Sequence, residues 1–260
     1  METNIPDAVE LPPPFGRLEA VIRLSVGFFI VAGCAVILMS IMVLMLPFRL
    51  ARIRAGNIYG HLVGRAVLWI GGWVPQKVGF ERLQDFTPAI YVSNHTSAMD
   101  IFSGMWLCPI GGCAVAKKEL VMVPFFGQAY WLAGHLLIDR GNRKSAIAGM
   151  NKTATLVEKS GLSIWMWPEG TRSRDGRLGA FKKGFAHMAL ATGLPVRPII
   201  VHDAHRYWPA RSFQVRPGPL KVELLDDIDT RDWTLENLDA QIESVRQLFL
   251  DGLGPGQRPE

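Results

Sequence analysis

The sequence predicts an α/β fold in which a mixed, mostly parallel sheet is flanked by helices and preceded by an N-terminal membrane helix and an amphipathic helix. From residue 78 onward, short apolar runs alternate with longer stretches of helical periodicity, as in parallel sheets with crossover helices. Before residue 76, a long apolar segment precedes a shorter amphipathic one. With 260 residues, 49% of them hydrophobic, the chain can form one sizeable domain and an appendage.

Residues 1–20 are predicted to form a disordered tail, because they contain Pro6, three successive prolines at 12–14 and few apolar residues. The segment has neither a basic region before the apolar run nor a small-residue cleavage site after it. We therefore expect no removable signal peptide, and we expect the apolar segment that follows to be retained.

Residues 21–75 are predicted to form a membrane anchor. Residues 24–48 contain no Asp, Glu, Lys or Arg, and about 25 residues of helix extend about 37 Å, enough for a hydrocarbon core of roughly 30 Å. Arg49, Arg52 and Arg54 follow, so the positive-inside tendency places the rest of the chain in the cytoplasm. A buried core helix and a helix that enters only one leaflet are the alternatives.

The second part of the anchor is an amphipathic helix expected over residues 57–70. Its apolar residues recur at intervals of three and four, while His61 and Arg65 lie on the other face. Such a stripe either packs on the following domain or lies at the bilayer interface, with Trp69 and Trp73 at headgroup level.

Residues 76–252 are predicted to form the α/β domain, and residues 253–260 a frayed tail. Strands are expected at 90–92, 113–116, 136–138, 163–167, 196–201 and 220–225, and helices at 100–107, 119–132, 144–159, 182–192 and 235–250. In such folds, functional groups gather at the carboxyl ends of the strands.

Charge and cysteine content restrict the partners. The net charge of +5 suits an anionic surface, and the mean hydropathy of +0.17 favours membrane lipids over nucleic acid. The three cysteines show neither disulfide-framework nor metal-ligand spacing. The sequence therefore predicts no nucleic-acid partner, no metal site and a reducing, cytoplasmic setting.

His95 and Asp100 follow an expected strand and stand five residues apart. If the carboxylate holds one ring nitrogen, the other can remove a proton from a hydroxyl, which is general-base chemistry. Backbone N–H groups of residues 94–97 are expected to stabilise an oxyanion. A lone structural histidine is the alternative reading.

A second stretch, residues 167–173, follows another expected strand and contains Glu169, Gly170, Thr171 and Arg172. The arginine offers a fork of donors suited to phosphate, and the glycine permits close backbone approach. A solvated basic loop is the alternative. Two smaller segments complete the set. Residues 134–140 end in Arg140, and residues 194–200 contain two prolines and are predicted to form an apolar wall of the site.

Together these segments resemble a known family. Asn94-His95 with Asp100, residues 134–140, residues 168–172 and residues 195–200 look like the four ordered motifs of the glycerolipid acyltransferases, in particular the bacterial 1-acylglycerol-3-phosphate acyltransferases. The resemblance covers residues 78–201 and implies that residues 76–252 are an acyltransferase catalytic domain. Leu137, where an aromatic residue is common, and Trp167, where phenylalanine is usual, depart from it.

The resemblance implies that His95 is the general base and Asp100 its orienting partner. It also implies a substrate-binding set around the acceptor's phosphate, namely Lys117, Arg140, Glu169, Gly170, Thr171 and Arg172.

The reaction implied by the resemblance is acyl transfer from a thioester to the free hydroxyl of 1-acyl-sn-glycerol 3-phosphate, giving phosphatidate. It needs no cofactor, since acyl-CoA or acyl carrier protein supplies the activated acyl group, and it belongs at the inner (cytoplasmic) membrane with the catalytic domain facing the cytoplasm. Alternatives are acyl transfer to another lysolipid, such as lyso-ornithine lipid, and a non-catalytic membrane protein that binds anionic lipid.

Overall fold

The computed structural model describes residues 11–83, 87–139, 141, 143–210 and 212–259, and one sheet organises them. Its strands are β1 (Trp73–Val78), β2 (Ile90–Ser93), β3 (Gly112–Lys117), β4 (Leu136–Ile138), β5 (Ser163–Met166), β6 (Val196–Val201) and β7 (Gly218–Leu224). The helices are α1 (Arg17–Leu44), α2 (Arg49–Ile70), α3 (Met99–Leu107), α4 (Phe126–Leu132), α5 (Arg143–Ser160), α6 (Gly184–Thr192), α7 (Ala204–Tyr207) and α8 (Leu238–Gly252). Single 3₁₀ turns are η1 (Phe80–Arg82), η2 (Lys118–Met122) and η3 (Pro255–Gln257).

The strand order is β1-β7-β6-β2-β5-β3-β4. Strands β6, β2, β5, β3 and β4 are parallel, β7 is antiparallel to β6, and β1 is parallel to β7. The prediction of a mixed, mostly parallel sheet flanked by helices is therefore confirmed. The carboxyl ends of β2, β3 and β5 meet at one edge.

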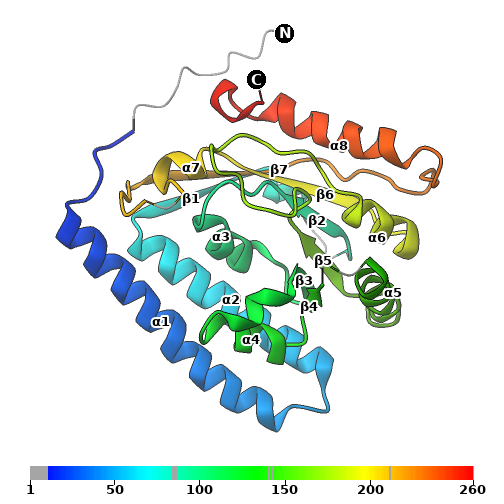
Figure 1. Cartoon of the computed structure of the whole chain (residues 1–260), viewed down its shortest axis with the longest axis horizontal. Coiled ribbons are helices and arrows are strands. Elements are labelled where there is room, and N and C mark those ends of the chain that lie inside the picture. The colour runs from blue at the N-terminus through cyan, green and yellow to red at the C-terminus, as the bar shows by residue number, and fades with distance from the viewer. Residues whose placement is uncertain (1–10, 84–86, 140, 142, 211, 260) are drawn as a thin grey trace.

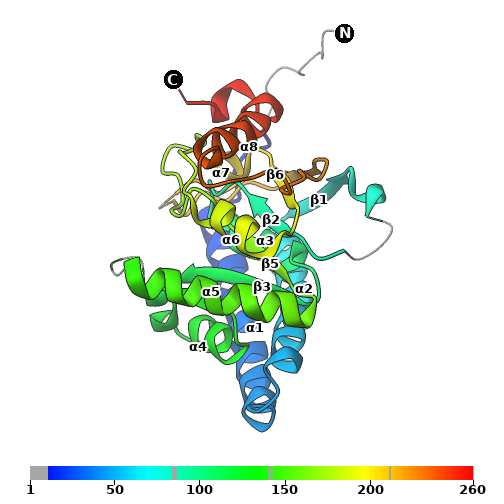
Figure 2. The ribbon, with the colours of Figure 1, turned by 90° about the vertical axis from the view of Figure 1, so that its right-hand side faces the viewer.

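Alternate residues of the central strands pack on opposite faces of the sheet. Ile90 and Val92 belong to the core under α5, α6 and α8, whereas Tyr91 belongs to the core under α3. In Figures 1 and 2, α8 lies on one side of the sheet, and α1, α2 and α4 lie on the other. Both faces of the parallel strands are thus covered, as their continuous apolar runs require.

Helices α1 and α2 run side by side along one edge of the molecule (Figure 1). Among the described residues, α1 is the one helix long and apolar enough to cross a membrane. One face of α1 packs on α2 and α4 through Val31, Ala35 and Met42, while Phe28 and Phe29 are exposed. It begins seven residues before the first residue of the predicted apolar segment 24–48 and ends four residues before its last residue. The early end is explained by Pro47, which lies in the turn before α2.

The predicted tail of residues 1–20 is wrong at its C-terminal end. The first turn of α1 begins at Arg17, and Phe15 N–H donates to the carbonyl of Val215. The Arg216 guanidinium donates to the carbonyl of Pro12. Residues 1–10 lie outside the described residues. Tertiary hydrogen bonds that a local reading does not contain thus order residues 12–20.

Strand β1 is absent from the predicted elements and crosses the predicted domain boundary between residues 75 and 76. Trp73 is 1% exposed and donates its indole N–H to the carbonyl of Arg216, so of the two alternatives for this residue the structure supports packing on the domain and not a position at lipid headgroups. Trp69 is 78% exposed. Pro75 argues against a strand in the sequence, because proline cannot donate a hydrogen bond to a neighbouring strand. It is tolerated in β1 because β1 forms the edge of the sheet.

The expected helix over residues 119–132 is two elements, η2 and α4. Pro124 restricts the residue before it to extended backbone, and Val123 has ψ 116°. Phe125 then adopts φ 63°, which is uncommon for a residue with a side chain. The periodicity of the segment therefore does not continue through Pro124.

The predicted frayed tail of residues 253–260 is wrong for residues 253–257. Leu253 packs in the core, and Gln257 is buried in η3. The Gln257 carbonyl accepts from Leu178 N–H, and its side-chain oxygen accepts from Asp203 N–H. These partners lie far away in sequence, so the glycines and prolines of the tail do not reveal them.

Candidate active site

His95 stands directly after β2, where the strand end is tied to β6. The neighbouring Asn94 accepts from Val201 N–H and donates to the Val201 carbonyl, both at 2.8 Å. This buried amide replaces two ladder hydrogen bonds just where β2 turns away from the sheet. The position of the histidine at the carboxyl edge of the sheet is therefore fixed by the residue before it.

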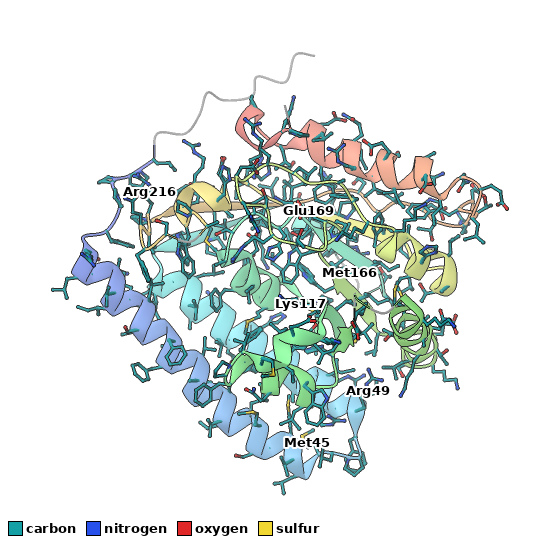
Figure 3. The ribbon with its side chains drawn as sticks, in the orientation of Figure 1. Met45, Arg49, Lys117, Met166, Glu169 and Arg216 are labelled. Carbon is teal, nitrogen blue, oxygen red and sulfur yellow. The ribbon has the colours of Figure 1, made fainter. Side chains whose placement is uncertain are left out.

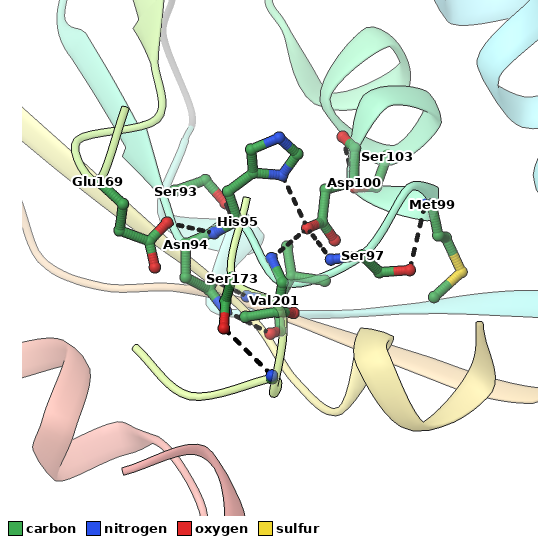
Figure 4. Close-up of polar contacts among 12 residues, drawn as sticks. Ser93, Asn94, His95, Ser97, Met99, Asp100, Ser103, Glu169, Ser173 and Val201 are labelled. Carbon is green, nitrogen blue, oxygen red and sulfur yellow. Dashed lines mark hydrogen bonds and ion pairs between the residues drawn. The ribbon is translucent and has the colours of Figure 1, made fainter. Parts of the chain in front are cut away.

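Asp100 lies in the first turn of α3 and holds the imidazole from below (Figure 4). Its Oδ2 is 3.0 Å from His95 Nδ1 and accepts from the N–H groups of Thr96 and Ser97 at 2.6 and 2.7 Å. With a carboxylate acceptor at Nδ1, the neutral ring carries its proton there and leaves Nε2 as an acceptor. The arrangement can remove a proton from a hydroxyl that reaches Nε2.

The N–H groups of residues 94–97 were expected to stabilise an oxyanion, and three of these four groups already have partners within the protein. Thr96 and Ser97 donate to Asp100, and His95 N–H donates to Glu169. These three donors are thus not available to an oxyanion in this arrangement.

Trp167 packs against one face of the His95 imidazole. The indole stacks on the His95 ring with centroids 4.6 Å apart and planes inclined by 20°. The exchange of the usual phenylalanine for tryptophan gives the histidine a larger apolar neighbour without removing a polar group.

The loop of residues 168–173 holds the main chain of His95. Glu169 Oε2 accepts from His95 N–H at 2.7 Å, and Ser173 N–H donates to the His95 carbonyl at 2.8 Å. Gly170 permits this approach with φ +72°, where a Cβ would lie 3.0 Å from the Lys182 side chain. The loop of residues 168–173 therefore holds the backbone of His95 in position.

Glu169 itself is only 4% exposed, and its Oε1 accepts from Gly179 N–H. Burial raises its pKa to about 8, although the backbone donors Gly179 and His95 act in the opposite direction and Asp100 adds to the rise. The carboxyl group does not line the cavity described next. It contacts the backbone N–H groups of His95 and Gly179, so the structure does not bring Glu169 to the cavity that the other predicted phosphate-binding residues line.

A cavity of about 560 Å³, called here the large cavity, opens beside His95. Its inner wall is mostly apolar and comes from α1 to α4 and from β3. The wall includes Leu38, Tyr59, Met105, Val115 and Ala129. A cavity of this kind fits a hydrocarbon chain.

The mouth of the large cavity is polar and basic. His95, Lys117, Gly170, Thr171 and Arg172 all line it. Lys117 ends β3, close to the middle of the molecule (Figure 3). Both cationic side chains are exposed, as suits groups that meet a charged ligand from water.

The structure thus brings five of the eight predicted site residues to the wall of one cavity. Asp100 is buried behind His95, and Glu169 lies behind the loop, where a second cavity of about 450 Å³ is lined by Glu169, Thr171 and Arg177. Arg140 lies outside the described residues. Asp100 contacts one of the five, His95, without lining the cavity itself.

Sequence reasoning missed the supporting role of Asn94, although a buried asparagine beside a candidate base is a recognisable signal. It also missed Trp165, which lines the large cavity from β5. Among the described residues, no three His, Cys, Asp or Glu side chains gather as metal ligands do.

The sequence of the chain is similar to that of known acyltransferases. A family profile described as Acyltransferase matches residues 75–202. A 1-acyl-sn-glycerol-3-phosphate acyltransferase of Limnanthes douglasii is 44% identical over 246 residues, which cover 94% of this chain and 86% of the relative. The chain belongs to the glycerolipid acyltransferase family. The protein of this name from Escherichia coli K12 is 36% identical over 171 residues, 66% of this acyltransferase and 69% of its own chain.

The fold of this acyltransferase is also known from a crystal structure. The 1-acyl-sn-glycerophosphate acyltransferase of Thermotoga maritima superposes with a TM-score of 0.72 at 20% identity, covering 92% of this chain and 97% of the other. At this identity the match shows the fold.

Proposed function

We propose that the chain transfers an acyl group from a thioester to the free hydroxyl of 1-acyl-sn-glycerol 3-phosphate, giving phosphatidate for phospholipid biosynthesis. The observation that carries this proposal is the position of the His95–Asp100 pair at the basic mouth of a mostly apolar cavity. A lysolipid phosphate has the matching hydroxyl, anionic headgroup and hydrocarbon chain. The names of the relatives from Limnanthes douglasii and Escherichia coli support the same acceptor.

In the proposed mechanism, His95 Nε2 removes the proton from the acceptor hydroxyl while Asp100 stabilises the charge on the ring. The acceptor oxygen attacks the thioester carbonyl carbon and forms a tetrahedral oxyanion. The C–S bond then breaks, and the leaving thiolate takes the proton from His95. The products are the ester and a free thiol, so no oxidant, metal or side-chain nucleophile enters the balance.

Lys117 and Arg172 are proposed to bind the acceptor's phosphate, with Gly170 and Thr171 shaping the loop between them. Arg140 is proposed as a further cation on the strength of the family resemblance. The acyl donor is acyl-CoA or acyl carrier protein, and no cofactor is needed, because the thioester is already activated.

Residues 21–75 are proposed to anchor the catalytic domain of residues 76–252 at the inner (cytoplasmic) membrane, with that domain facing the cytoplasm. The exposed apolar side chains of α1, among them Phe28, Phe29 and Ile37, support contact with lipid. The basic residues at the start of α2 support the orientation. An anchored enzyme meets its substrates where they partition, which raises their effective concentration.

The test uses membranes that contain the full chain, supplied with acyl-CoA and 1-acyl-sn-glycerol 3-phosphate, and measures thiol release. We expect release by the wild type and its loss in His95→Ala. The matched control is His187→Ala, because His187 is exposed on α6 and does not line the large cavity. Full activity of His95→Ala would refute the assignment of the base.

A panel of lysolipids with one acyl donor separates the alternatives. The phosphate acceptor should give the highest kcat/KM, whereas a higher value for lyso-ornithine lipid would change the acceptor and leave the base intact. Binding of anionic vesicles without thiol release from any donor would instead favour a lipid-binding protein.

A further inference from the structure

The loop that follows β5 contributes to the walls of two cavities. Gly170 and Arg172 line the large cavity, whereas Glu169 and Ser173 line the second cavity of about 450 Å³. Thr171 lines both. The two cavities therefore adjoin at this loop, and a group placed on it can reach a ligand in either one.

Lys182 lines the second cavity, and its side chain lies over Gly170. A Cβ at Gly170 would lie 3.0 Å from Lys182 Cδ and 3.2 Å from its Nζ. The Lys182 backbone N–H donates to the Pro168 carbonyl at 2.8 Å, which ties the lysine to the start of the same loop. Because Gly170 lines the mouth of the large cavity, the ammonium group lies next to that mouth as well as in the wall of the second cavity.

The Lys182 ammonium has no carboxylate partner in the described part of the chain, although it is exposed to ligands from water. The next residue differs, since Lys183 Nζ is 2.6 Å from a carboxylate oxygen of Asp239. Lys118 pairs with Asp139 at the same distance. Lys182 thus places an unpaired positive charge where the two cavities adjoin.

The loop carries a second cation of the same kind. Arg172, two residues after Gly170, is exposed and lines the large cavity, and none of the described carboxylates pairs with it. Two cations on one loop repel each other, so an anion that contacts both is stabilised by both charges. Phosphate suits such a place, because its oxygens accept charge-assisted hydrogen bonds from lysine and arginine.

The two carboxyl groups of the second cavity do not take the place of this anion. Asp175 Oδ1 accepts from the Ser173 hydroxyl at 2.7 Å and from the Arg177 N–H at 3.1 Å. The oxygens of Glu169 accept from backbone N–H groups. Burial also raises the Glu169 pKa to about 8, so this group keeps its proton at neutral pH. The charge of Lys182 is therefore available to a ligand.

We propose that the Lys182 ammonium binds a phosphate group of a substrate at the loop where the two cavities adjoin. This inference rests on the proposed function, in which both substrates carry phosphate. One source is the phosphate of the lysolipid acceptor. The other is the phosphopantetheine end of the acyl donor, which acyl-CoA and acyl carrier protein share.

The test compares Lys182→Met, which keeps an unbranched apolar stem, with Lys182→Arg, which keeps the charge, in membranes that contain the full chain. Lys183→Met is the matched control, since Lys183 lines neither cavity and its exposed ion pair contributes little to stability. We expect Lys182→Met to raise KM for one substrate about tenfold. Its kcat, and KM in Lys182→Arg, should stay within about threefold of the wild type, with an unchanged unfolding midpoint.

Each substrate is varied in turn at a saturating concentration of the other. A rise in KM for 1-acyl-sn-glycerol 3-phosphate alone assigns the contact to the acceptor. A rise for acyl-CoA alone, absent with an acyl thioester of N-acetylcysteamine, which carries no phosphate, assigns it to the donor. Unchanged KM for both substrates in Lys182→Met, or an equal rise in Lys183→Met, would overturn the inference.

Binding of each substrate without the other is measured in parallel, because no transfer then occurs. The Kd of the lysolipid or of acyl-CoA should rise about tenfold in Lys182→Met. A wild type that releases no thiol but whose binding falls in this variant would refute the proposed reaction and retain the phosphate contact. Equal Kd values in wild type and Lys182→Met, with normal thiol release, would retain the reaction and remove the contact.

Discussion

The Glu169 carboxyl group accepts a hydrogen bond from the His95 backbone N–H at 2.7 Å. The two residues are 74 positions apart and follow adjacent parallel strands, β2 and β5. Ser173 N–H completes the contact by donating to the His95 carbonyl. The main chain of the base is therefore set by the loop that also carries Arg172 to the cavity mouth.

This relationship predicts that Glu169 acts on kcat more than on acceptor binding. In Glu169→Ala, the His95 N–H loses its partner, and kcat should fall between about 5- and 100-fold. Glu169→Gln keeps one acceptor oxygen and should retain more activity. Steady-state assays should show KM for the lysolipid within about threefold of the wild type in both variants, because the carboxyl does not line the large cavity.

Glu223→Gln is the matched control, since Glu223 binds His202 and Lys221 away from the cavity. A large rise in the lysolipid KM of Glu169→Gln at unchanged kcat would instead place Glu169 at the phosphate.

Burial of Glu169 also predicts how stability depends on pH. Its pKa is raised to about 8 in the fold, so between the usual glutamate range and about pH 8 the folded carboxyl keeps a proton that the unfolded one has lost. Raising the pH through this window therefore lowers the free energy of unfolding, by up to about 1.4 kcal/mol per pH unit. Glu169→Gln should lack this component. Denaturant titrations at several pH values compare the two slopes, and parallel slopes would contradict the prediction.

Asp100 is predicted to be as important as His95. One oxygen accepts from His95 Nδ1 and from the N–H groups of Thr96 and Ser97. Asp100→Asn removes the negative charge and disturbs the tautomer, so kcat should fall by about 10²- to 10⁴-fold. Thiol release measures it, with the exposed Asp226→Asn as control. Activity within about threefold of the wild type would show that the carboxylate does not orient the base.

The sequence was sufficient to predict the His95–Asp100 pair, because both members lie within one turn that follows one strand. The parallel sheet was predictable too, since each buried strand is a continuous apolar run. The contact between Glu169 and His95 was not, because it depends on β2 and β5 being neighbours. The family resemblance places Glu169 near the acceptor's phosphate, and only tertiary packing shows that its carboxyl group is directed at the backbone of His95.

The missed strand β1 and the error at the C-terminal end have the same cause. Strand β1 and the turn around Gln257 are ordered by partners such as Arg216 and Asp203 that lie far along the chain. The prolines and glycines of both segments correctly indicate that the isolated backbone has little preference for a regular helix or strand. The composition does not show the tertiary hydrogen bonds that order this backbone in the fold.

Arg172 is predicted to recognise the acceptor's charge. It is exposed at the cavity mouth, so Arg172→Glu should raise KM for the phosphate acceptor by about tenfold or more, while KM for the acyl donor changes less. Kinetics with each substrate varied in turn separate the two effects. Arg174→Glu, in the same loop but not lining the large cavity, is the control. Equal increases for both substrates would place Arg172 elsewhere in the mechanism.

The ion pair of Arg197 and Asp227 gives a prediction about stability. Arg197 is buried in β6 and donates twice to Asp227, and it also donates to Tyr91, on which Trp165 stacks. Asp227→Ala leaves a buried cation without its carboxylate, which should cost about 2–4 kcal/mol, since Asp227 is partly exposed. Arg197→Met with Asp227→Ala removes both charges and should recover part of that loss. Denaturant unfolding of the two single variants and the double variant measures the coupling, and strictly additive losses would show that the buried charge is not the origin of the cost.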